Sequence, residues 1–370
     1  MRANAVSAVI FSNSNDEALK ELTENRSMSS VPFGCRYRLI DFTLSNLANA
    51  GITNIGIITN ENYRSLMDHV GSGLYWDLDR KNGGLHIIPP FITGENKLSG
   101  LEDTCFRASE FISGLNSEYI IVCESGVIAN VNISALINSH IKNDADITFV
   151  YRKAERPDKF KNTLKFKVID QKIVGSKKAY RLSESGNFSM GLAIFKRAAF
   201  IDLVGIAKGD KDEDVFAKLI SENISNYKMF GFEHTGFAAA LDNKKSFYEN
   251  SMLLFEESVR EDLFNKERPI LTKTRDDMPT RYGPHAKVKD CLIADGCIIE
   301  GTVKNSILFR GVRVNRGAVV ENSILMQGVG ICENAKAKYL IADKNSVITG
   351  KNPVNGTTHK AFIVKKNQVF

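Results

Sequence analysis

Histidine and cysteine side chains are the ones best suited to hold a transition metal or to act as nucleophiles, and neither type is grouped for that chemistry. The six histidines show no metal-ligand spacing, and the six cysteines include no C-x-x-C pair. Most of the cysteines lie in apolar, strand-like segments. This pattern favours reduced thiols over disulfides or a zinc site. It predicts a cytoplasmic protein without a His/Cys metal centre.

The charge composition narrows the class of ligand. The 370 residues include 49 Lys or Arg and 43 Asp or Glu, which gives a formal net charge of +6. A small positive excess suits phosphorylated metabolites, whereas interleaved charges of both signs argue against a nucleic-acid-binding stripe. No segment approaches the roughly 18 consecutive apolar residues that span a bilayer. The apolar N-terminal stretch is predicted to be a buried strand and not a signal peptide. We therefore expect neither a nucleic-acid nor a membrane partner.

The first two thirds of the chain alternate short apolar runs with amphipathic stretches. The predicted strands are residues 5–11, 54–59, 118–123, 146–151 and 192–195. The predicted helices are residues 39–51, 104–115, 132–143, 213–224 and 251–264. This alternation indicates an α/β domain with a mostly parallel sheet and helices on both faces. Ligands of such sheets bind beyond the carboxyl ends of the strands, so the loops after Phe11, Thr59 and Cys123 are the candidate site.

The rhythm changes after about residue 285. One ladder of small or apolar residues recurs every six positions at Val314, Val320, Met326 and Cys332. A second ladder in the same register consists of Ser306, Val312, Ala318 and Ile324. A six-residue period is typical of a parallel β-helix, in which each hexad forms one side of a triangular coil. A β-sandwich with accidental spacing is the alternative, but two ladders in phase over four steps rarely arise by chance.

Three segments carry a resemblance to a known family. VPFGCRYRLIDFTLSNLANAGI at residues 31–52 is very similar to the segment that opens bacterial glucose-1-phosphate adenylyltransferases, also called ADP-glucose pyrophosphorylases. YWDLDR at residues 75–80 and SMGLAIF at residues 189–195 also match segments of that family. The resemblance covers most of the chain, from about residue 5 to about residue 355.

This resemblance implies a particular domain organisation. Residues 1–250 would form a nucleotidyltransferase-like domain and residues 251–285 a helix and connector. Residues 286–370 would form a C-terminal left-handed parallel β-helix. Because one fold hosts many functions, activity must still be judged from the site residues.

The family's phosphate-binding loop is replaced in this chain. In the family a glycine-rich loop with an arginine follows the first strand and holds the triphosphate. Here the corresponding residues 13–19 read NSNDEAL, with Ala18 at the arginine position. Asp16 and Glu17 place negative charge where the triphosphate would lie, which disfavours ATP. The family lysine further along the chain falls on Met28.

The two metal-binding aspartates of the family are also replaced. They fall on Gly126 and Ala240. Asp242, two residues along a strand from Ala240, would lie about 7 Å further on and too far to take over as a ligand. We therefore predict that the family's Mg²⁺ site is lost, that no cofactor is bound and that the active site is degenerate.

Some ligand-binding positions are retained. In the family, basic residues near the junction with the β-helix contact phosphorylated activators such as sugar bisphosphates. The resemblance therefore makes Arg26, Arg38 and Lys360 candidate effector-binding residues, with Lys365 and Lys366 completing a basic pocket. Simple solvation of these surface cations is the alternative.

A weakened sugar-phosphate site is a second retained feature. Ser189, Met190 and Gly191 match the family's sugar-phosphate segment. The E-K-P motif that accompanies it in the family is missing near residue 175.

Together these features favour a non-catalytic, regulatory subunit of a glucose-1-phosphate adenylyltransferase, the enzyme that makes ADP-glucose for glycogen. Its expected partner is the catalytic subunit, in a hetero-oligomer such as a heterotetramer. Two alternatives remain: a divergent nucleotidyltransferase with weak residual activity, and a stand-alone sugar-phosphate sensor.

Overall fold

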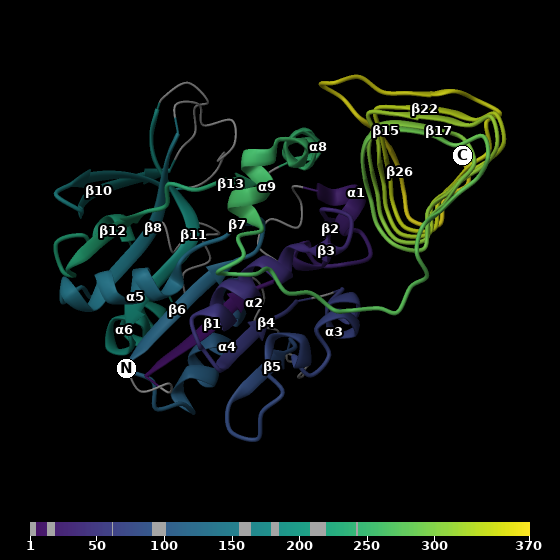
Figure 1. Cartoon of the computed structure of the whole chain (residues 1–370). Coiled ribbons are helices and arrows are strands. Elements are labelled where there is room, and N and C mark those ends of the chain that lie inside the picture. Colours follow the sequence, from purple (N-terminus) through teal and green to yellow (C-terminus); the bar gives the residue numbers. More distant parts are fainter. Residues whose placement is uncertain are drawn as a thin grey trace.

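The computed structural model of the chain describes residues 5–12, 19–60, 62–90, 101–154, 164–178, 185–207, 220–241 and 243–370. An α/β domain and a coiled β domain lie side by side, with a pair of helices above their junction (Figure 1). No described helix is long and apolar enough to cross a membrane. The helix predicted at residues 213–224 lies largely outside the described residues.

The α/β domain is built on a nine-stranded sheet. In spatial order its strands are β5 (Gly84–Ile88), β4 (Asn54–Ile58), β1 (Val6–Phe11), β6 (Tyr119–Glu124), β11 (Gly186–Lys196), β8 (Ile147–Ala154), β12 (Met229–Glu233), β10 (Lys172–Lys178) and β9 (Leu164–Ile169). All strands except β11 and β10 run in one direction, so the predicted mostly parallel sheet is confirmed. β11 is antiparallel to its neighbours β6 and β8, and its first residues also pair in antiparallel fashion with β9.

Helices cover both faces of this sheet, as the sequence predicted. One face carries α2 (Leu39–Asn49), α3 (Arg64–Val70) and α5 (Ile133–Lys142), and the other α4 (Leu101–Ser113) and α6 (Arg197–Ala207). β1 shows why its run is apolar throughout: Val6, Ala8 and Ile10 pack on the first face, and Val9 packs on the second.

Several short elements complete the α/β domain. They are the helix α1 (Lys20–Thr23), the 3₁₀ helices η2 (Met28–Ser30) and η3 (Leu74–Trp76), the hairpin β2 (Pro32–Phe33) and β3 (Tyr37–Arg38), and the antiparallel pair β7 (Val127–Ala129) and β13 (Ala238–Ala240).

The single helix predicted at residues 251–264 is wrong. The chain forms α8 (Lys244–Met252), a 3₁₀ turn η5 (Leu253–Phe255) and α9 (Glu257–Leu263). The break lies at Glu256, whose backbone is extended. The Arg260 guanidinium donates to the Leu254 carbonyl at 2.8 Å, which satisfies a group that the break leaves outside a helix. α8 begins at Asn243, which caps it reciprocally with Ser246.

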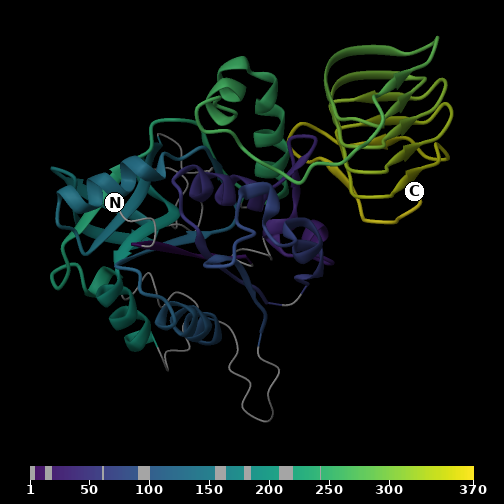
Figure 2. The same cartoon turned by 60° about the horizontal axis from the view of Figure 1, so that its bottom comes forward.

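The C-terminal domain is a left-handed parallel β-helix, as predicted, and Figure 2 shows its coils stacked side-on. One of its sheets contains β14 (Arg281–Tyr282), β16 (Ile298–Ile299), β18 (Arg313–Val314), β21 (Gly330–Ile331) and β24 (Val347–Ile348). The remaining strands are β15 (Lys287–Ile293), β17 (Thr302–Leu308), β19 (Val319–Glu321), β20 (Ile324–Leu325), β22 (Lys336–Lys338), β23 (Leu340–Ala342), β25 (Val354–Asn355) and β26 (Phe362–Val364).

The prediction of a strict six-residue repeat in the β-helix is only partly confirmed. Thr302 pairs with Val319, and Val319 pairs with Lys336, so one coil takes 17 residues and one of its three sides is a residue short. The inward positions are therefore Val303, Leu308, Val314, Val320, Leu325, Ile331, Ala337, Ala342, Ile348 and Val354. The ladder holds through Val320 and then slips by one residue. Leu325 and Ile331 point inward in place of the predicted Met326 and Cys332.

Met326, one of the residues displaced by this slip, belongs to the interdomain contact. Ile324 and Met326 face the α/β domain and are fully buried there, together with Ile307 and Ile341 of neighbouring coils. α1, η2 and α8 supply the other side of this apolar cluster. Tyr248 of α8 also donates to the Asn322 carbonyl at 2.8 Å. The β-helix is thus joined to the α/β domain through a shared core.

Candidate functional site

The carboxyl ends of the central strands meet at one edge of the sheet. Phe11 at the end of β1 pairs with Ile58 of β4 and with Glu124 of β6. The loops predicted to hold the site therefore start side by side. Residues 13–18, with Asp16, Glu17 and Ala18, lie outside the described residues, and so does Asp242.

Three of the four replaced family positions converge in the structure. An added Cβ on Gly126 would lie 3.5 Å from the methyl carbon of Met28. The Gly126 carbonyl accepts a hydrogen bond from the Leu241 backbone at 2.8 Å, and Ala240 pairs with Val127 across the β7–β13 ladder. Met28 is fully buried and Ala240 is 2% exposed. The resemblance had matched them one by one, and the fold brings them to one place.

The chemistry of this cluster does not fit a magnesium ion. Mg²⁺ takes oxygen ligands, commonly from one or two carboxylates and from substrate phosphates. Met28, Gly126 and Ala240 offer a thioether, a hydrogen and a methyl group. Among the described residues no three His, Cys, Asp or Glu side chains lie together as a metal site. The cluster can pack apolar surface but cannot hold charge on a phosphate.

The predicted sugar-phosphate residues lie at an irregular point of β11. The register between β11 and β8 shifts between Ser189 and Ala193. Gly191 there has φ of 62°, a left-handed conformation that glycine adopts without strain, and its amide donates to the Ser189 hydroxyl at 3.2 Å. Met190 and Gly191 line a hollow at this point of the strand. Ser189 is buried beside it.

Glu124 is a residue of this hollow that the sequence analysis did not select. It ends β6, faces Gly191, and would be 2.9 Å from a Cβ added there. Its side chain is reached by water, yet the protein atoms around it raise the carboxyl pKa by desolvation. The signal available in the sequence was its place, directly after the apolar run of residues 119–123.

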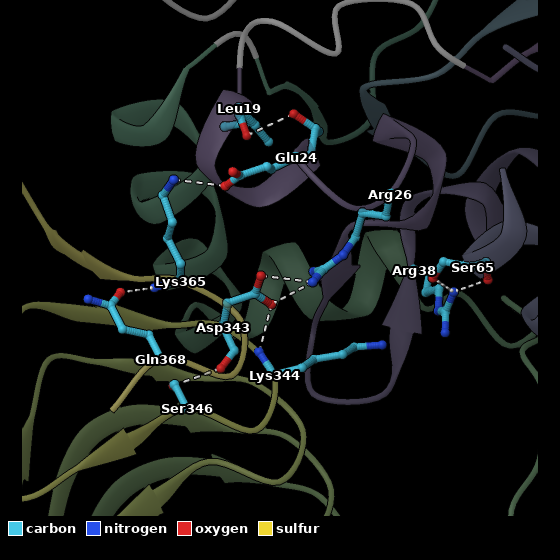
Figure 3. A network of polar contacts seen from close by, with 11 residues as sticks. Leu19, Glu24, Arg26, Arg38, Ser65, Asp343, Lys344, Ser346, Lys365 and Gln368 are labelled. Atoms are coloured by element: carbon cyan, nitrogen blue, oxygen red, sulfur yellow. Dashed lines mark hydrogen bonds and ion pairs between the residues drawn. The ribbon is translucent and has the colours of Figure 1, made fainter. Parts of the chain in front are cut away.

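Arg26 forms a buried ion pair with the β-helix. One of its guanidinium nitrogens donates to both carboxylate oxygens of Asp343, at 2.9 and 2.8 Å, and both side chains are at most 3% exposed (Figure 3). The other terminal nitrogen of Arg26 is buried and makes no hydrogen bond with the described residues. Because a charged group without a partner is costly in the interior, that nitrogen is suited to an anion.

Arg38 lies in a second hollow, between the α/β domain and the β-helix. Its guanidinium donates to the Ser65 carbonyl at 2.6 Å and to the Ser65 hydroxyl at 3.0 Å (Figure 3). The cationic lining of this hollow consists of Arg36, Arg38, Lys273, Arg275, Arg310 and Lys344. This set is strongly basic, and the geometry suits an anion with several charges.

Two cations of this basic hollow are held in low dielectric. Burial, with Arg38 and Arg26 nearby, lowers the pKa of Lys344 to about 7. Arg310 is 8% exposed, and one of its terminal nitrogens has no hydrogen-bond partner among the described residues. Asp277, 3.5 Å from its Nε, is the acidic neighbour. A bound anion would offset the repulsion between Lys344 and the neighbouring arginines. It would also accept a hydrogen bond from the unpartnered nitrogen of Arg310.

Asp41 holds the wall of the basic hollow in place. This fully buried carboxylate contacts His69 Nε2 at 2.5 Å and accepts from the Arg38 backbone at 3.0 Å and from the Thr272 hydroxyl at 2.5 Å. Burial lowers the pKa of His69 despite the carboxylate. The connector at Thr272 is thereby fixed to the start of α2, which positions Arg38.

Lys360 lies away from the other two predicted effector residues. It lines a different groove with Glu21, Lys244 and the C-terminal strand. Lys365 pairs with Glu24 at 2.8 Å, on the opposite side of Asp343 from Lys344 (Figure 3). Lys344 extends from the β-helix towards Arg38. It takes the place beside Arg38 that the sequence analysis predicted for Lys360. No local pattern in the sequence marks Lys344, because the docking of the two domains brings it there.

Comparison with known proteins gives two family matches. Residues 7–238 match the family model described as nucleotidyl transferase. Residues 277–361 match the model described as GlmU-like, C-terminal hexapeptide.

Similar curated proteins span almost the whole chain. Glycogen biosynthesis protein GlgD of Geobacillus stearothermophilus is 33% identical over 99% of this chain and 97% of its own length. GlgD of Bacillus subtilis (strain 168) is 29% identical over the same shares. Glucose-1-phosphate adenylyltransferase of Bacillus mycoides (strain KBAB4) is 29% identical over 92% of each chain.

Proposed function

Because this chain belongs to the nucleotidyl transferase family, in the group formed by GlgD and the glucose-1-phosphate adenylyltransferases, we propose that it is a non-catalytic, regulatory subunit of the adenylyltransferase of glycogen biosynthesis. A role in glycogen biosynthesis follows from the relationship itself. In the proposal, the chain assembles in the cytoplasm with a catalytic subunit that makes ADP-glucose and diphosphate from ATP and glucose 1-phosphate. A heterotetramer is the expected assembly.

One observation carries the non-catalytic part: the convergence of Met28, Gly126 and Ala240 in a buried, apolar cluster. Adenylyl transfer needs positive charge and a carboxylate-held metal where the triphosphate reacts. Removing a single charge-stabilising group typically costs about 3 kcal/mol of transition-state stabilisation. Loss of the lysine and both carboxylates together would bring turnover below detection, although such losses do not simply add.

The basic hollow supports the regulatory part. Arg38 and Arg36 come from the α/β domain, Arg310 and Lys344 from the β-helix, and Arg275 from the connector between them. A phosphorylated effector bound there would touch all three parts of the chain. It would therefore stabilise one arrangement of the domains over another. Through shared interfaces, that preference would alter the activity of the catalytic partner.

The proposal is tested with purified chains in a steady-state assay of ADP-glucose formation. This chain alone, the catalytic subunit alone and the mixture are compared, with and without a metal chelator. We expect no turnover by this chain alone and a changed kcat or effector response in the mixture, with co-elution of the two chains.

The alternatives give different results in the same experiment. Chelator-sensitive turnover by this chain alone would make it a divergent nucleotidyltransferase. No co-elution and unchanged partner kinetics, with a sugar phosphate still bound, would make it a stand-alone sensor.

A further inference from the structure

The basic hollow between the two domains is lined by cations without matching anions. Among the described residues that line it, none is Asp or Glu. Asp343, directly before Lys344, accepts from the Lys344 backbone amide at 2.7 Å and gives both carboxylate oxygens to Arg26. Asp277, the other carboxylate nearby, faces Arg310. The wall of the hollow therefore leaves most of its own positive charge uncompensated.

The Lys344 side chain ends in an amine without a partner. Its Nζ makes no hydrogen bond or ion pair with the described residues, and the residue is half-buried, so water reaches it. The side chain extends from the β-helix towards Arg38 (Figure 3). Burial, with Arg38, Arg26 and Arg275 nearby, outweighs Asp343 and lowers the pKa of the amine to about 7. About half of these amines are uncharged at pH 7, against less than about 0.1% for a lysine of ordinary pKa.

The other side chains of the hollow are less suited to act as nucleophiles. Burial raises the pKa of the Cys35 thiol and of the Tyr37 hydroxyl, so both stay protonated at neutral pH. A protonated thiol is a poor nucleophile, because the thiolate is the reactive form. His69 also lines the hollow, but its Nε2 contacts the Asp41 carboxylate. Lys344 is therefore the strongest nucleophile of the hollow.

The surroundings of Lys344 supply two elements of an acyl-transfer reaction. A lysine that is uncharged beside other cations is an activated nucleophile. Guanidinium groups bind phosphate through several hydrogen bonds and stabilise the charge of a departing phosphate. A small acyl phosphate has a carbonyl carbon for the amine and a phosphate group for the arginines, so it matches both elements.

We propose that Lys344 is a modification site, at which the amine accepts the acyl group of a small acyl phosphate held by the arginines of the hollow. The Nζ lone pair attacks the carbonyl carbon and a C–N bond forms. The bond between that carbon and the phosphate oxygen breaks, and inorganic phosphate leaves with the proton that the amine loses. No group is oxidised or reduced. The product is an amide, which carries no charge at neutral pH, so the hollow loses one cation.

The reaction is a property of the isolated chain and does not depend on the regulatory role. Only its consequence for a catalytic partner rests on the proposed function. An acylated Lys344 can no longer gain a proton when a multiply charged anion binds, so acylation should weaken effector binding. The basic hollow would then respond to two signals, a bound anion and the supply of acyl phosphate.

Incubation of the full-length chain with acetyl phosphate, followed by peptide mass spectrometry, tests the proposal. At about pH 7.5 we expect Lys344 to be acetylated roughly tenfold or more faster than Lys351. Lys351 is an exposed lysine of the β-helix without an ion pair among the described residues. The rate at Lys344 should level off above about pH 8, because the amine is then already uncharged. The rate at a lysine of ordinary pKa keeps rising up to about pH 10.

A variant separates phosphate recognition from the basicity of the amine. Arg275→Ala removes one guanidinium of the hollow and should slow the reaction with acetyl phosphate severalfold more than the reaction with N-acetylimidazole, an uncharged acyl donor. Arg197→Ala, on α6 and away from the hollow, is the matched control and should change neither rate. Inorganic phosphate at about 50 mM should slow acetylation by acetyl phosphate, which tests the same point without a variant.

Three results would overturn the proposal. The first is acetylation of Lys344 no faster than that of Lys351. The second is a rate at Lys344 that still rises about tenfold per pH unit between pH 8 and 9. The third is an unchanged ratio of the two acylation rates in Arg275→Ala together with no protection by phosphate. Acetylation is read from the mass of this chain and regulation from ADP-glucose formation, so failure of one leaves the other standing.

Discussion

Arg26 and Asp343 are 317 residues apart in the sequence and form an ion pair in the interior, in which one guanidinium nitrogen donates to both carboxylate oxygens, at 2.9 and 2.8 Å. Arg26 precedes η2, whose Met28 lies against Gly126. Asp343 is followed by Lys344, which lines the basic hollow. The pair therefore connects the region of Met28 and Gly126 to the proposed effector site through two short stretches of backbone.

Breaking this pair should destabilise the protein strongly. A buried charge that loses its partner costs about 3–5 kcal/mol, whereas replacing both charges by apolar groups is often neutral. We expect Arg26→Met and Asp343→Leu each to lower the free energy of unfolding by about that amount, and the double variant to recover most of the loss. Denaturant unfolding of the four proteins measures this coupling. Additive losses in the double variant would contradict a coupled buried pair.

Binding of a multiply charged anion to the basic hollow should be coupled to proton uptake. The pKa of Lys344 is about 7 in the free protein because of burial and the nearby Arg38 and Arg26. An anion favours the charged amine and raises this pKa, so binding takes up a proton above pH 7 and weakens as the pH rises. His69, whose pKa is lowered from its ordinary value, titrates below this window.

Calorimetry with a hexose bisphosphate in buffers of different ionisation enthalpy measures the proton count. Lys344→Arg should keep binding but abolish the uptake between about pH 7 and 9. Arg275→Ala should weaken binding at every pH. Arg197→Ala, far from the hollow on α6, is the control. Binding that strengthens with pH would contradict this account.

Returning the family lysine to position 28 should destabilise the fold without restoring activity. Met28 is fully buried among apolar residues, and no carboxylate faces it from Gly126 or Ala240. An ammonium group there would lack a partner, so Met28→Lys is expected to cost about 3 kcal/mol or more, against less than about 1.5 for Met28→Leu. Thermal and denaturant unfolding give the comparison. A stable Met28→Lys variant would mean that this side chain faces open solvent.

Because the coil has 17 residues, substitutions at the neighbouring positions 331 and 332 should differ strongly in their effect on stability. Ile331 points into the β-helix and is fully buried, whereas Cys332 is half-buried on the outside. Ile331→Asp should unfold the β-helix or cost more than about 4 kcal/mol, while Cys332→Asp should cost less than about 1 kcal/mol. Soluble yield and unfolding free energy report the difference. Equal losses of unfolding free energy in the two variants would contradict the inward position of Ile331.

Local patterns predicted most of the elements. The apolar run at residues 5–11 forms β1, and the amphipathic stretch at 39–51 forms α2. The sequence pattern predicts both elements, because a strand buried on both faces is apolar throughout and a helix buried on one face is apolar on that face. The slip at Leu325 was missed, since a 17-residue coil and an 18-residue coil share the same first ladder steps. The break at Glu256 was missed because the residues around it remain good helix formers.

Tertiary contacts set the limits of prediction for the site. Met28, Gly126 and Ala240 were found through the resemblance to a family, since no spacing rule brings three distant small or apolar residues together. Lys344 and Arg310 join Arg38 only after the β-helix docks on the α/β domain through Ile307, Ile324 and Ile341. That docking depends on which side of each coil faces outward, and a one-residue slip changes it.

We propose that this chain regulates adenylyl transfer and does not catalyse it. The most direct test of this proposal is radiometric detection of ADP-glucose formed from ATP and glucose 1-phosphate by the purified chain, alone and mixed with a catalytic adenylyltransferase subunit. We expect no product above background from this chain alone and a changed rate in the mixture. Mg²⁺-dependent product formation by this chain alone, abolished by a chelator, would contradict it.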